Sequence, residues 1–407
     1  MSKSIYGPVQ NWETDFDHAD PSYNENVHEI WKSLREKCPL AHTTRYGGAW
    51  LPSNYEMIRA IAYDTQHFSS NGIIVGSDRP TVPKPVGAAP PITSDPPFHT
   101  QARRLLLPPF SSKKIALLEE DIRDLCRKLL SDLNINQQTQ VFDASNQYAR
   151  MIPLGVIAKM IGLPQDENDL LFSFIKNIIE DVNLSPEELV KNRELLDEYI
   201  DTQIEDHRIN PKDDLISYLI NSEIDGAPLD EQHIRGTIGL MFIAGVDTTW
   251  SMIGSSIWHL ATHPEDLKQL NTSPDLIDSA IEEFLRAYAP VTMARIVNED
   301  FEFFGSELKK DDWMLVPYPA ANRDPAAFEN PDSFQIDRKL NRHAAFGLGI
   351  HRCIGSNLAR LELKVAIQEF IRYFPAFELA NPKEIKWSSG QIRGPRKLDV
   401  RSLGHKR

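Results

Sequence analysis

The chain has 407 residues and carries 44 lysines and arginines against 58 aspartates and glutamates, a formal net charge of −14. Its length allows a core large enough to enclose a cofactor. The acidic balance disfavours a nucleic-acid partner, whose phosphates require a concentrated basic surface. The three cysteines, Cys38, Cys126 and Cys353, are odd in number and far apart, which excludes a disulfide framework and favours a reducing compartment.

The N-terminal segment and the apolar runs bear on location. Residues 1–20 show neither an apolar signal region nor an Arg-rich amphipathic pattern. The longest apolar run, residues 238–246, is about half the length of a membrane span. We therefore expect a cytoplasmic protein without a membrane anchor.

The first 95 residues or so combine short strand-like pieces with a long Gly/Pro-rich segment. A strand is predicted at Ala49–Ser53, and the Gly/Pro-rich segment covers 71–91. Loops of that length inside a compact domain are usually functional or disordered. We interpret 71–91 as a lid or binding loop, with simple disorder as the alternative.

Helical periodicity begins near residue 115. The spacing predicts one apolar face, made of Leu118, Ile122, Leu125, Leu129 and Leu133. Cys126 lies at the edge of this face, where a packing role is expected. A second helix is predicted to begin at Pro186, because Ser185 and Glu188 form a capping box around it.

The later elements are predicted by periodicity and by prolines. A periodic segment from about 230 to 263, ended by Pro264, predicts a helix on the order of 50 Å long. Another helix is predicted from a cap at Ser273 and Pro274 to a stop at Pro290. Short antiparallel strands, an irregular meander and a last helix are expected at 295–318, 320–338 and about 356–373.

The most informative segment is 345–362, AFGLGIHRCIGSNLARLE, which places Cys353 among Gly347, Gly349 and Gly355 directly before the last helix. Glycines permit a tight backbone. The helix start directs N–H groups and a positive dipole end toward the sulfur, which favours the thiolate. A thiolate is the form of cysteine that binds a metal.

Two other interpretations of Cys353 are open at this point. A buried core cysteine beside a turn is common, but it explains neither the flanking glycines nor the preceding Phe346. A zinc site using His343, His351 and Cys353 is possible but lacks a fourth ligand nearby in the sequence.

The segment FGLGIHRCIG, residues 346–355, resembles the haem-binding loop of the cytochrome P450 superfamily, in which the cysteine thiolate is the axial iron ligand. The resemblance spans roughly 95–362, because three further motifs follow the family's order. It implies a mainly α fold with small antiparallel β-sheets and a single haem domain over 1–407, with a mixed part at about 1–95 and a helical, haem-binding part at about 96–407. It also implies haem b bound by Cys353 and contacted by Phe346, Gly347, His351, Gly355, Ala244 and Gly245.

The first further motif is Glu283-Phe284-Leu285-Arg286, which resembles the family's Glu-x-x-Arg pair. Taken locally, a Glu and an Arg three residues apart usually form an exposed ion pair worth ~0.2 to 0.5 kcal/mol. The resemblance implies instead a structural role, in which the pair binds the meander through Arg338 and supports the cysteine loop.

The second motif, residues 244–249 (AGVDTT), lies in the middle of the long predicted helix. Glycine is unfavourable inside a helix and threonine can bond back to an earlier carbonyl, so the motif predicts a local widening or kink. The resemblance makes it an oxygen-binding groove with Asp247 and Thr248 as a proton-relaying pair. The presence of both residues favours a monooxygenase over the peroxide-using members of the family.

The third motif, residues 95–103 (DPPFHTQAR), places His99 and Arg103 on one face of a helix. By resemblance these two residues, with Arg295 and His351, bind the haem propionates through charge-assisted hydrogen bonds. For any one of them alone, an ordinary surface role is the competing interpretation.

The resemblance implies a haem-thiolate monooxygenase that activates dioxygen with electrons derived from NAD(P)H. Because no flavin or ferredoxin region is fused to the chain, we expect a ferredoxin and a ferredoxin reductase as partners, and a monomer. A basic docking patch is expected at Lys113, Lys114, Arg342 and Arg352. Solvated surface charge is the alternative for these residues.

The expected substrate pocket is mainly apolar and consists of Leu240, Ile243, Ala244, Val291, Thr292, Met293, Gln391 and Ile392. It suits a small or medium hydrophobic substrate, with Thr292 or Gln391 supplying one orienting hydrogen bond. The alternatives are a peroxygenase or an oxidative coupling or nitrating enzyme of the same fold, or a haem protein that binds a small ligand without turnover.

Overall fold

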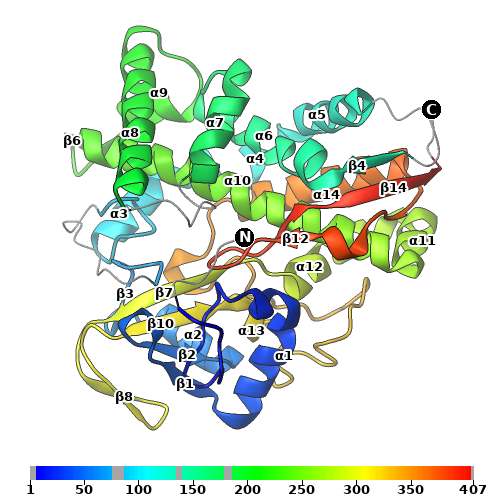
Figure 1. Ribbon diagram of the computed structural model, residues 1–407. Coiled ribbons are helices and arrows are strands. Elements are labelled where there is room, and N and C mark those ends of the chain that lie inside the picture. The colour runs from blue at the N-terminus through cyan, green and yellow to red at the C-terminus, as the bar shows by residue number, and fades with distance from the viewer. Residues whose placement is uncertain (1–5, 76–86, 134–139, 178–185, 405–407) are drawn as a thin grey trace.

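The computed structural model describes residues 6–75, 87–133, 140–177 and 186–404. Figure 1 shows a lower part built on a β-sheet and an upper part made mostly of helices, with one long helix between them. Each part has its own core of buried apolar side chains. The molecule is mainly α-helical, with small sheets, as the sequence predicted.

The largest sheet has five strands in the order β1-β2-β10-β7-β3. Their bounds are Leu40–Thr43, Ala49–Pro52, Trp313–Pro317, Thr292–Val297 and Phe68–Ser69. The β2 and β10 strands run parallel, whereas the other pairs are antiparallel. Strands from both sides of residue 95 therefore form one sheet. Central β10 is buried along its whole length, which explains its unbroken apolar sequence.

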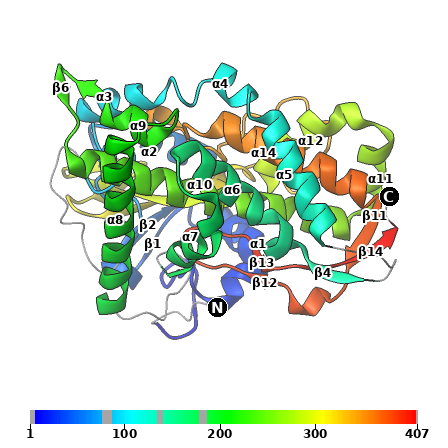
Figure 2. The same ribbon diagram turned by 90° about the horizontal axis from the view of Figure 1, so that it is seen from above.

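The remaining strands form small antiparallel sheets. One has the order β11-β14-β4, with bounds Ala376–Leu379, Asp399–Gly404 and Val141–Asp143. Three two-stranded pairs are β5–β6 (Glu223–Ile224, Ala227–Pro228), β8–β9 (Phe301–Phe303, Ser306–Leu308) and β12–β13 (Lys386–Trp387, Pro395–Lys397). The C-terminal sheet packs beside the end of the long helix (Figures 1 and 2).

Helices make up most of the regular secondary structure. Those of the N-terminal half are α1 Pro21–Lys37, α2 Tyr55–Tyr63, α3 Phe98–Leu106, α4 Ser112–Ala116, α5 Glu119–Asp132, α6 Met151–Ile161 and α7 Asn168–Ile175. The later helices are α8 Pro186–Ile209, α9 Leu215–Ile220, α10 Glu231–Thr262, α11 Pro264–Thr272, α12 Ile277–Ala287, α13 Tyr318–Ala321 and α14 Ser356–Tyr373. The long helix α10 contacts α6, α8 and α14 (Figure 2).

The long helix has the bounds that the sequence predicted. It begins after Asp230, whose carboxylate accepts a hydrogen bond of 2.7 Å from the backbone N–H of His233. It is apolar on most sides, which is typical of a helix buried in a core. Gly245 allows α6 to approach closely, because a Cβ there would lie 2.9 Å from Cγ1 of Ile157.

Several local expectations need correction. The most buried line of α5 is Ile122, Cys126 and Leu130, so Cys126 lies at the centre of the buried face. A short 3₁₀ turn, Pro274–Leu276, precedes α12, and Ser273 makes no side-chain cap. Helix α1, which begins at Pro21 behind a cap from Asp20, was not predicted.

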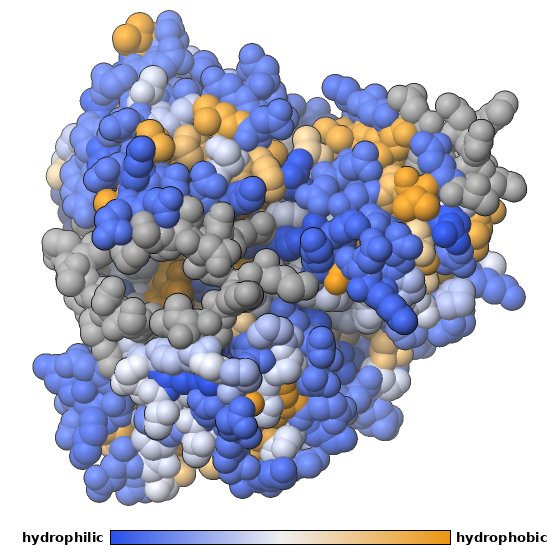
Figure 3. All heavy atoms as spheres, in the orientation of Figure 1, coloured by the Kyte–Doolittle hydropathy of each residue, from blue (hydrophilic) through white to orange (hydrophobic). Residues whose placement is uncertain are grey.

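Two further expectations fall on parts of the chain that the structure does not describe. The cap predicted at Ser185 lies outside the described residues, although α8 begins at the expected Pro186. Residues 76–86 of the predicted loop also lie outside them. Within the described residues, no helix is long and apolar enough to cross a membrane, and the face drawn in Figure 3 is mainly hydrophilic with hydrophobic residues in separate groups.

Candidate active site

The cysteine loop is a tight turn between the meander and α14. The backbone N–H of Cys353 donates a hydrogen bond of 2.7 Å to the carbonyl of Phe346, which closes the loop. Gly349 has φ of +67°, and a Cβ there would lie 2.0 Å from the carbonyl oxygen of Ala62. Only glycine therefore fits where the loop crosses α2.

Cys353 lies in a recess. Its side chain is exposed, yet surrounding protein raises the pKa of its thiol by desolvation. The backbone N–H of Gly355 and the charge of Arg103 act in the opposite direction and lower that pKa. Cys126, by contrast, is fully buried, and burial raises its pKa to about 12. Of these two thiols, only that of Cys353 is accessible to a ligand.

Four residues expected at the propionates come together beside this recess. His99 and Arg103 are carried by α3, Arg295 by β7, and His351 by the turn before Cys353. The rings of His99 and His351 lie 4.3 Å apart between centroids. The nearby positive charges of Arg103 and Arg295 act on the pKa of both histidines.

One acidic residue, Asp95, lies near this cluster and acts on the pKa of His99 and of Arg295. Burial and the neighbouring arginines lower the pKa of His99 to about 4 and that of His351 to about 2. Among the described residues, none of the four groups forms a salt bridge, and both ring nitrogens of His99 are buried without a hydrogen-bond partner. The nearby Asp95 accepts hydrogen bonds from Ser69 and Ser70. The arrangement fits a bound molecule that brings carboxylates of its own, as haem does.

The other polar contacts of the cluster are made with neighbouring chain segments. The Nε2 atom of His351 lies 2.8 Å from Oγ of Ser70. Arg103 donates to the carbonyl of Arg352 at 2.5 Å, and Arg295 to the carbonyl of Ala294 at 2.7 Å. Arg104, the next residue along α3, is exposed.

The predicted proton-relaying pair, Asp247 and Thr248, lies in an unbroken part of α10. Every residue of this helix is α-helical, so the motif does not interrupt it, although Oγ of Thr248 donates the expected hydrogen bond of 2.8 Å to the carbonyl of Ala244. Thr248 is partly exposed, whereas Asp247 is fully buried. The structure pairs Asp247 with Arg396 of β13, which the sequence analysis did not identify.

Arg396 makes two further contacts with residues of α10. Its Nη1 donates a hydrogen bond of 2.9 Å to Oγ of Ser251, and its guanidinium lies 4.2 Å from the ring of Trp250. Because Arg396 lies 149 residues from Asp247 along the chain, no local sequence pattern could reveal this ion pair.

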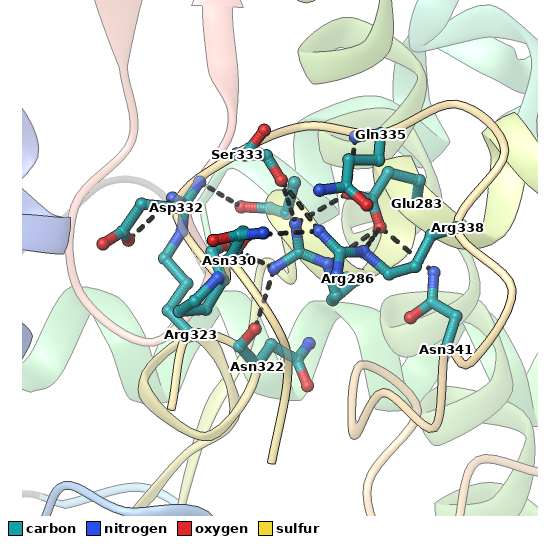
Figure 4. Close-up of polar contacts among 12 residues, drawn as sticks. Glu283, Arg286, Asn322, Arg323, Asn330, Asp332, Ser333, Gln335, Arg338 and Asn341 are labelled. Atoms are coloured by element: carbon teal, nitrogen blue, oxygen red, sulfur yellow. Dashed lines mark hydrogen bonds and ion pairs between the residues drawn. The ribbon is translucent and has the colours of Figure 1, made fainter. Parts of the chain in front are cut away.

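The Glu283–Arg286 pair is buried, so the interpretation as an exposed ion pair is wrong. Figure 4 shows its polar contacts. The Glu283 carboxylate accepts hydrogen bonds of 2.7 and 2.8 Å from Arg286 and one of 2.9 Å from Arg338. It also accepts from the backbone N–H of Gln335. Arg286 in turn donates to the carbonyl of Pro331. The contact with Arg338 that the resemblance implied is present and joins α12 to the meander.

The zinc alternative finds no support. His343 lies 3.1 Å from a carboxylate oxygen of Glu282, and His351 faces Ser70. Over the described part of the chain, no three histidine, cysteine or acidic side chains gather as a metal site would require.

Most expected pocket residues are partly exposed, as wall residues should be. These are Leu240, Ile243, Ala244, Val291, Met293, Gln391 and Ile392. The segment that follows α12 and the segment around residue 392 meet at a β-bridge between Val291 and Ile392. The Gln391 amide nitrogen lies 3.4 Å from the carbonyl of Ile73.

The prediction that Thr292 lines the substrate pocket needs correction. It is 5% exposed, and its side chain acts on the pKa of the Tyr23 phenol of α1. Successive side chains of a strand point to opposite faces, so Thr292 faces away from Met293 and Arg295. It cannot orient a substrate on their side of β7.

The fold and the cysteine loop are typical of haem enzymes with a thiolate iron ligand. Residues 166–398 match the family model described as Cytochrome P450. A curated relative named Cytochrome P450, from Bacillus subtilis, is 33% identical over 386 residues, covering 92% of this chain and 93% of the relative. The chain belongs to the cytochrome P450 family.

Solved structures agree with this assignment. The Bacillus subtilis polyketide synthase cytochrome P450 PksS superposes with a TM-score of 0.86 at 30% identity, covering 96% of this chain and 100% of PksS. CYP109E1 from Bacillus megaterium, in complex with testosterone, gives 0.86 at 28% identity, covering 94% and 99%. The protein is therefore a P450 monooxygenase, an oxidoreductase that uses haem iron, and bacterial relatives of this kind receive electrons from redox partners.

Proposed function

We propose that Cys353 is the axial ligand of haem b, and that His99, Arg103, Arg295 and His351 bind its propionates. The observation that carries this proposal is the juxtaposition of an accessible thiol with two arginines and two histidines that form no salt bridge among the described residues. When bound, the haem supplies the oxygen chemistry, for which a thiolate ligand is suited. The remaining haem contacts proposed are Phe346, Gly347, Gly355, Ala244 and Gly245.

Proton delivery is assigned to Thr248 and Asp247. The Thr248 hydroxyl lies on the partly exposed side of α10 and can pass a proton onward while its oxygen stays near the Ala244 carbonyl. Asp247 is bound to Arg396 on the other side. For Asp247 to exchange a proton with Thr248, its carboxylate has to leave Arg396 or act through water.

The substrate proposed is a small or medium hydrophobic organic molecule that is hydroxylated with dioxygen. Support comes from the aliphatic side chains of Leu240, Ile243, Val291 and Ile392, which line partly exposed surface of α10 and of the bridged segments. Relatives named for polyketide biosynthesis and for hydroxylation and epoxidation of mycinamicin IV show that the family's substrates vary widely. Gln391 is the polar side chain proposed to orient the substrate.

The electron donors proposed are a ferredoxin and its NAD(P)H-dependent reductase. Lys113, Lys114, Arg342 and Arg352 are all exposed. An acidic partner would be steered by such charges despite the chain's negative total. Replacing Lys113 and Lys114 with glutamine should slow reduction by ferredoxin and weaken its salt dependence, with reduction by dithionite as the control.

The ligand assignment is tested by replacing Cys353 with serine. The reduced carbon monoxide complex should lose the absorption band that is characteristic of thiolate ligation. The matched controls are Cys38→Ser and Cys126→Ser, which should retain that band. A Cys353→Ser protein with an unchanged spectrum would refute the assignment.

The proton relay is tested by Thr248→Ala. This variant should consume NADH and release more of the reduced oxygen as peroxide, with less product per NADH. Unchanged coupling would remove Thr248 from the mechanism. Efficient turnover with hydrogen peroxide alone, together with insensitivity to Thr248→Ala, would favour the peroxygenase alternative. A library of hydrophobic compounds, screened for the spin-state change of the haem on binding, identifies the substrate class.

A further inference from the structure

A second recess lies outside the candidate active site. It has a volume of about 630 Å³ and is bounded by the first half of α1, the C-terminal part of α10, the end of α12 and the segment 382–393. Figure 1 shows α1, α12 and β12 converging in this region. Its size falls in the range of sites that take small organic ligands.

One wall of the recess is aromatic. The rings of Trp258 and Trp387 pack edge to face with centroids 5.4 Å apart, and Tyr288 packs against Trp258 at 5.8 Å. All three side chains are partly exposed and line the recess. Ile385 and Val27 add aliphatic surface. A flat apolar group placed against this wall would bury surface that is now wet.

The same recess contains an arginine without an anionic partner. Arg393 stacks on Trp387 at 4.2 Å and donates through Nη2 to the carbonyl of Asn24 at 3.0 Å. Its Nε is buried and has no hydrogen-bond partner, and no carboxylate of the described residues pairs with this guanidinium. Burial and the nearby positive charge of Arg323 lower its pKa to about 10. Such a group attracts an anion, preferably a carboxylate that can accept two hydrogen bonds.

The other charges around the recess set the polarity of the site. Glu25 and Glu29 of α1 are exposed at its rim, where solvent and salt screen them. His28 also lines it and is neutral, because burial and nearby arginines keep its pKa well below the usual value. The inner part is therefore cationic and the rim acidic.

The recess adjoins the backbone that carries the expected substrate pocket. A separate, smaller void of about 10 Å³ shares Val27, His28, Tyr288 and Arg393 with the recess and is also lined by Thr292. The backbone N–H of Arg393 donates to the carbonyl of Pro290 at 2.8 Å. The next residue after Pro290, Val291, and the residue before Arg393, Ile392, form the antiparallel bridge.

We propose that this recess is a second binding site for a small monocarboxylate with an aromatic or fused-ring body. Its carboxylate binds Arg393 and its rings pack on Trp258 and Trp387. The acidic rim disfavours molecules with several negative charges. This inference goes beyond the proposed function, because binding here requires neither turnover nor any of the residues assigned to the haem.

The test uses the haem-loaded protein with 5-fluorotryptophan in place of its seven tryptophans. Trp258→Phe and Trp387→Phe variants assign the two fluorine signals. Titration with 2-naphthoate should shift both signals saturably, and the neutral 2-naphthalenemethanol should bind at least tenfold more weakly. The haem absorption spectrum, recorded at the same concentrations, reports binding in the active site separately.

Arg393→Gln should reduce the preference for the carboxylate to less than twofold, while the exposed control Arg372→Gln leaves it unchanged. If Arg393→Gln does not fold, the exposed double variant Glu25→Gln/Glu29→Gln replaces it. That variant should tighten naphthoate binding at least twofold at low salt without tightening binding of the alcohol. Unshifted Trp258 and Trp387 signals, equal affinity for the two probes, or unchanged binding in both sets of variants would overturn the proposal.

Discussion

Arg396, close to the C-terminus, forms a buried ion pair with Asp247 in the middle of α10. The pair joins strand β13 to the helix that carries the proposed proton relay. Asp247 is fully buried, so its charge depends on groups supplied by distant parts of the chain. A residue outside every recognised motif therefore controls the environment of a motif residue.

Replacing Arg396 with glutamine should destabilise the folded protein by about 3 kcal/mol, because a buried carboxylate loses its ion-pair partner. The measurement is the thermal unfolding midpoint of the haem-loaded protein. In the Arg396→Gln/Asp247→Asn double variant, much of the loss should be recovered, since the buried charge is removed with its partner. Arg401→Gln, which removes a more exposed pair with Glu378, is the control and should change stability by less than about 1 kcal/mol. Equal losses in the single and double variants would contradict this account.

Replacing Glu283 with glutamine should cost about 3 to 5 kcal/mol, because Arg286 and Arg338 would keep buried charges without a carboxylate. The variant should also retain less haem per chain after purification, since the meander precedes the cysteine loop. The control is Glu282→Gln on the same helix. Its carboxylate pairs with Arg360 but is 31% exposed, so its removal should cost about 1 kcal/mol. Comparable losses in both variants would argue against a special role for the buried pair.

Gly349→Ala should prevent formation of the cysteine loop, because the added Cβ would collide with the carbonyl of Ala62 at 2.0 Å. The expected result is loss of most bound haem, measured as haem absorbance per chain. Gly226→Ala is the matched control. Gly226 also has positive φ, +79°, but nothing lies within 4 Å of the added Cβ, so only backbone strain is tested there. Full haem content in Gly349→Ala would show that the loop can move away from α2.

One buried carboxyl, that of Glu362 on α14, should make the protein less stable as the pH rises from about 5 to 8. Burial raises its pKa to about 8 from an ordinary 4.5. The folded chain therefore holds a proton that the unfolded chain has lost, and the contribution falls by ~1.4 kcal/mol per pH unit across this interval. Glu362→Gln, which cannot ionise, should lose less stability between pH 5 and 8 than the parent. Parallel pH profiles of the unfolding midpoint would contradict the assigned pKa.

Much of the fold was predictable because its signals are local. The bounds of α10 follow from the cap at Asp230 and from Pro264, and those of α14 follow from the glycine turn before it. The missed helix α1 has weaker signals, since its sequence is polar and contains Asn26, which leaves helical geometry. The five-stranded sheet was not predictable in detail, because β2 and β10 pair across more than 250 residues.

In the candidate site, too, some residues could be predicted from the sequence and others could not. Cys353 was identified from the glycines and the helix start around it, whereas the roles of Glu283 and Thr248 were implied by the family resemblance of their motifs. Thr292 was named as a pocket residue without knowledge of the side of β7 on which it lies, since strand register depends on partners that a short sequence does not show.

By itself, the sequence determined the cysteine loop and the main helices, because these depend on capping, periodicity and glycine positions along a short stretch of chain, and its motifs carried the family resemblance. Only the tertiary structure decided that Arg396 pairs with Asp247, that the His99 and His351 rings meet, and that Arg393 lies beside an aromatic recess. Those contacts join residues far apart in the chain. They form because burial forces each charged or polar group to take whichever partner the packing of distant elements places next to it.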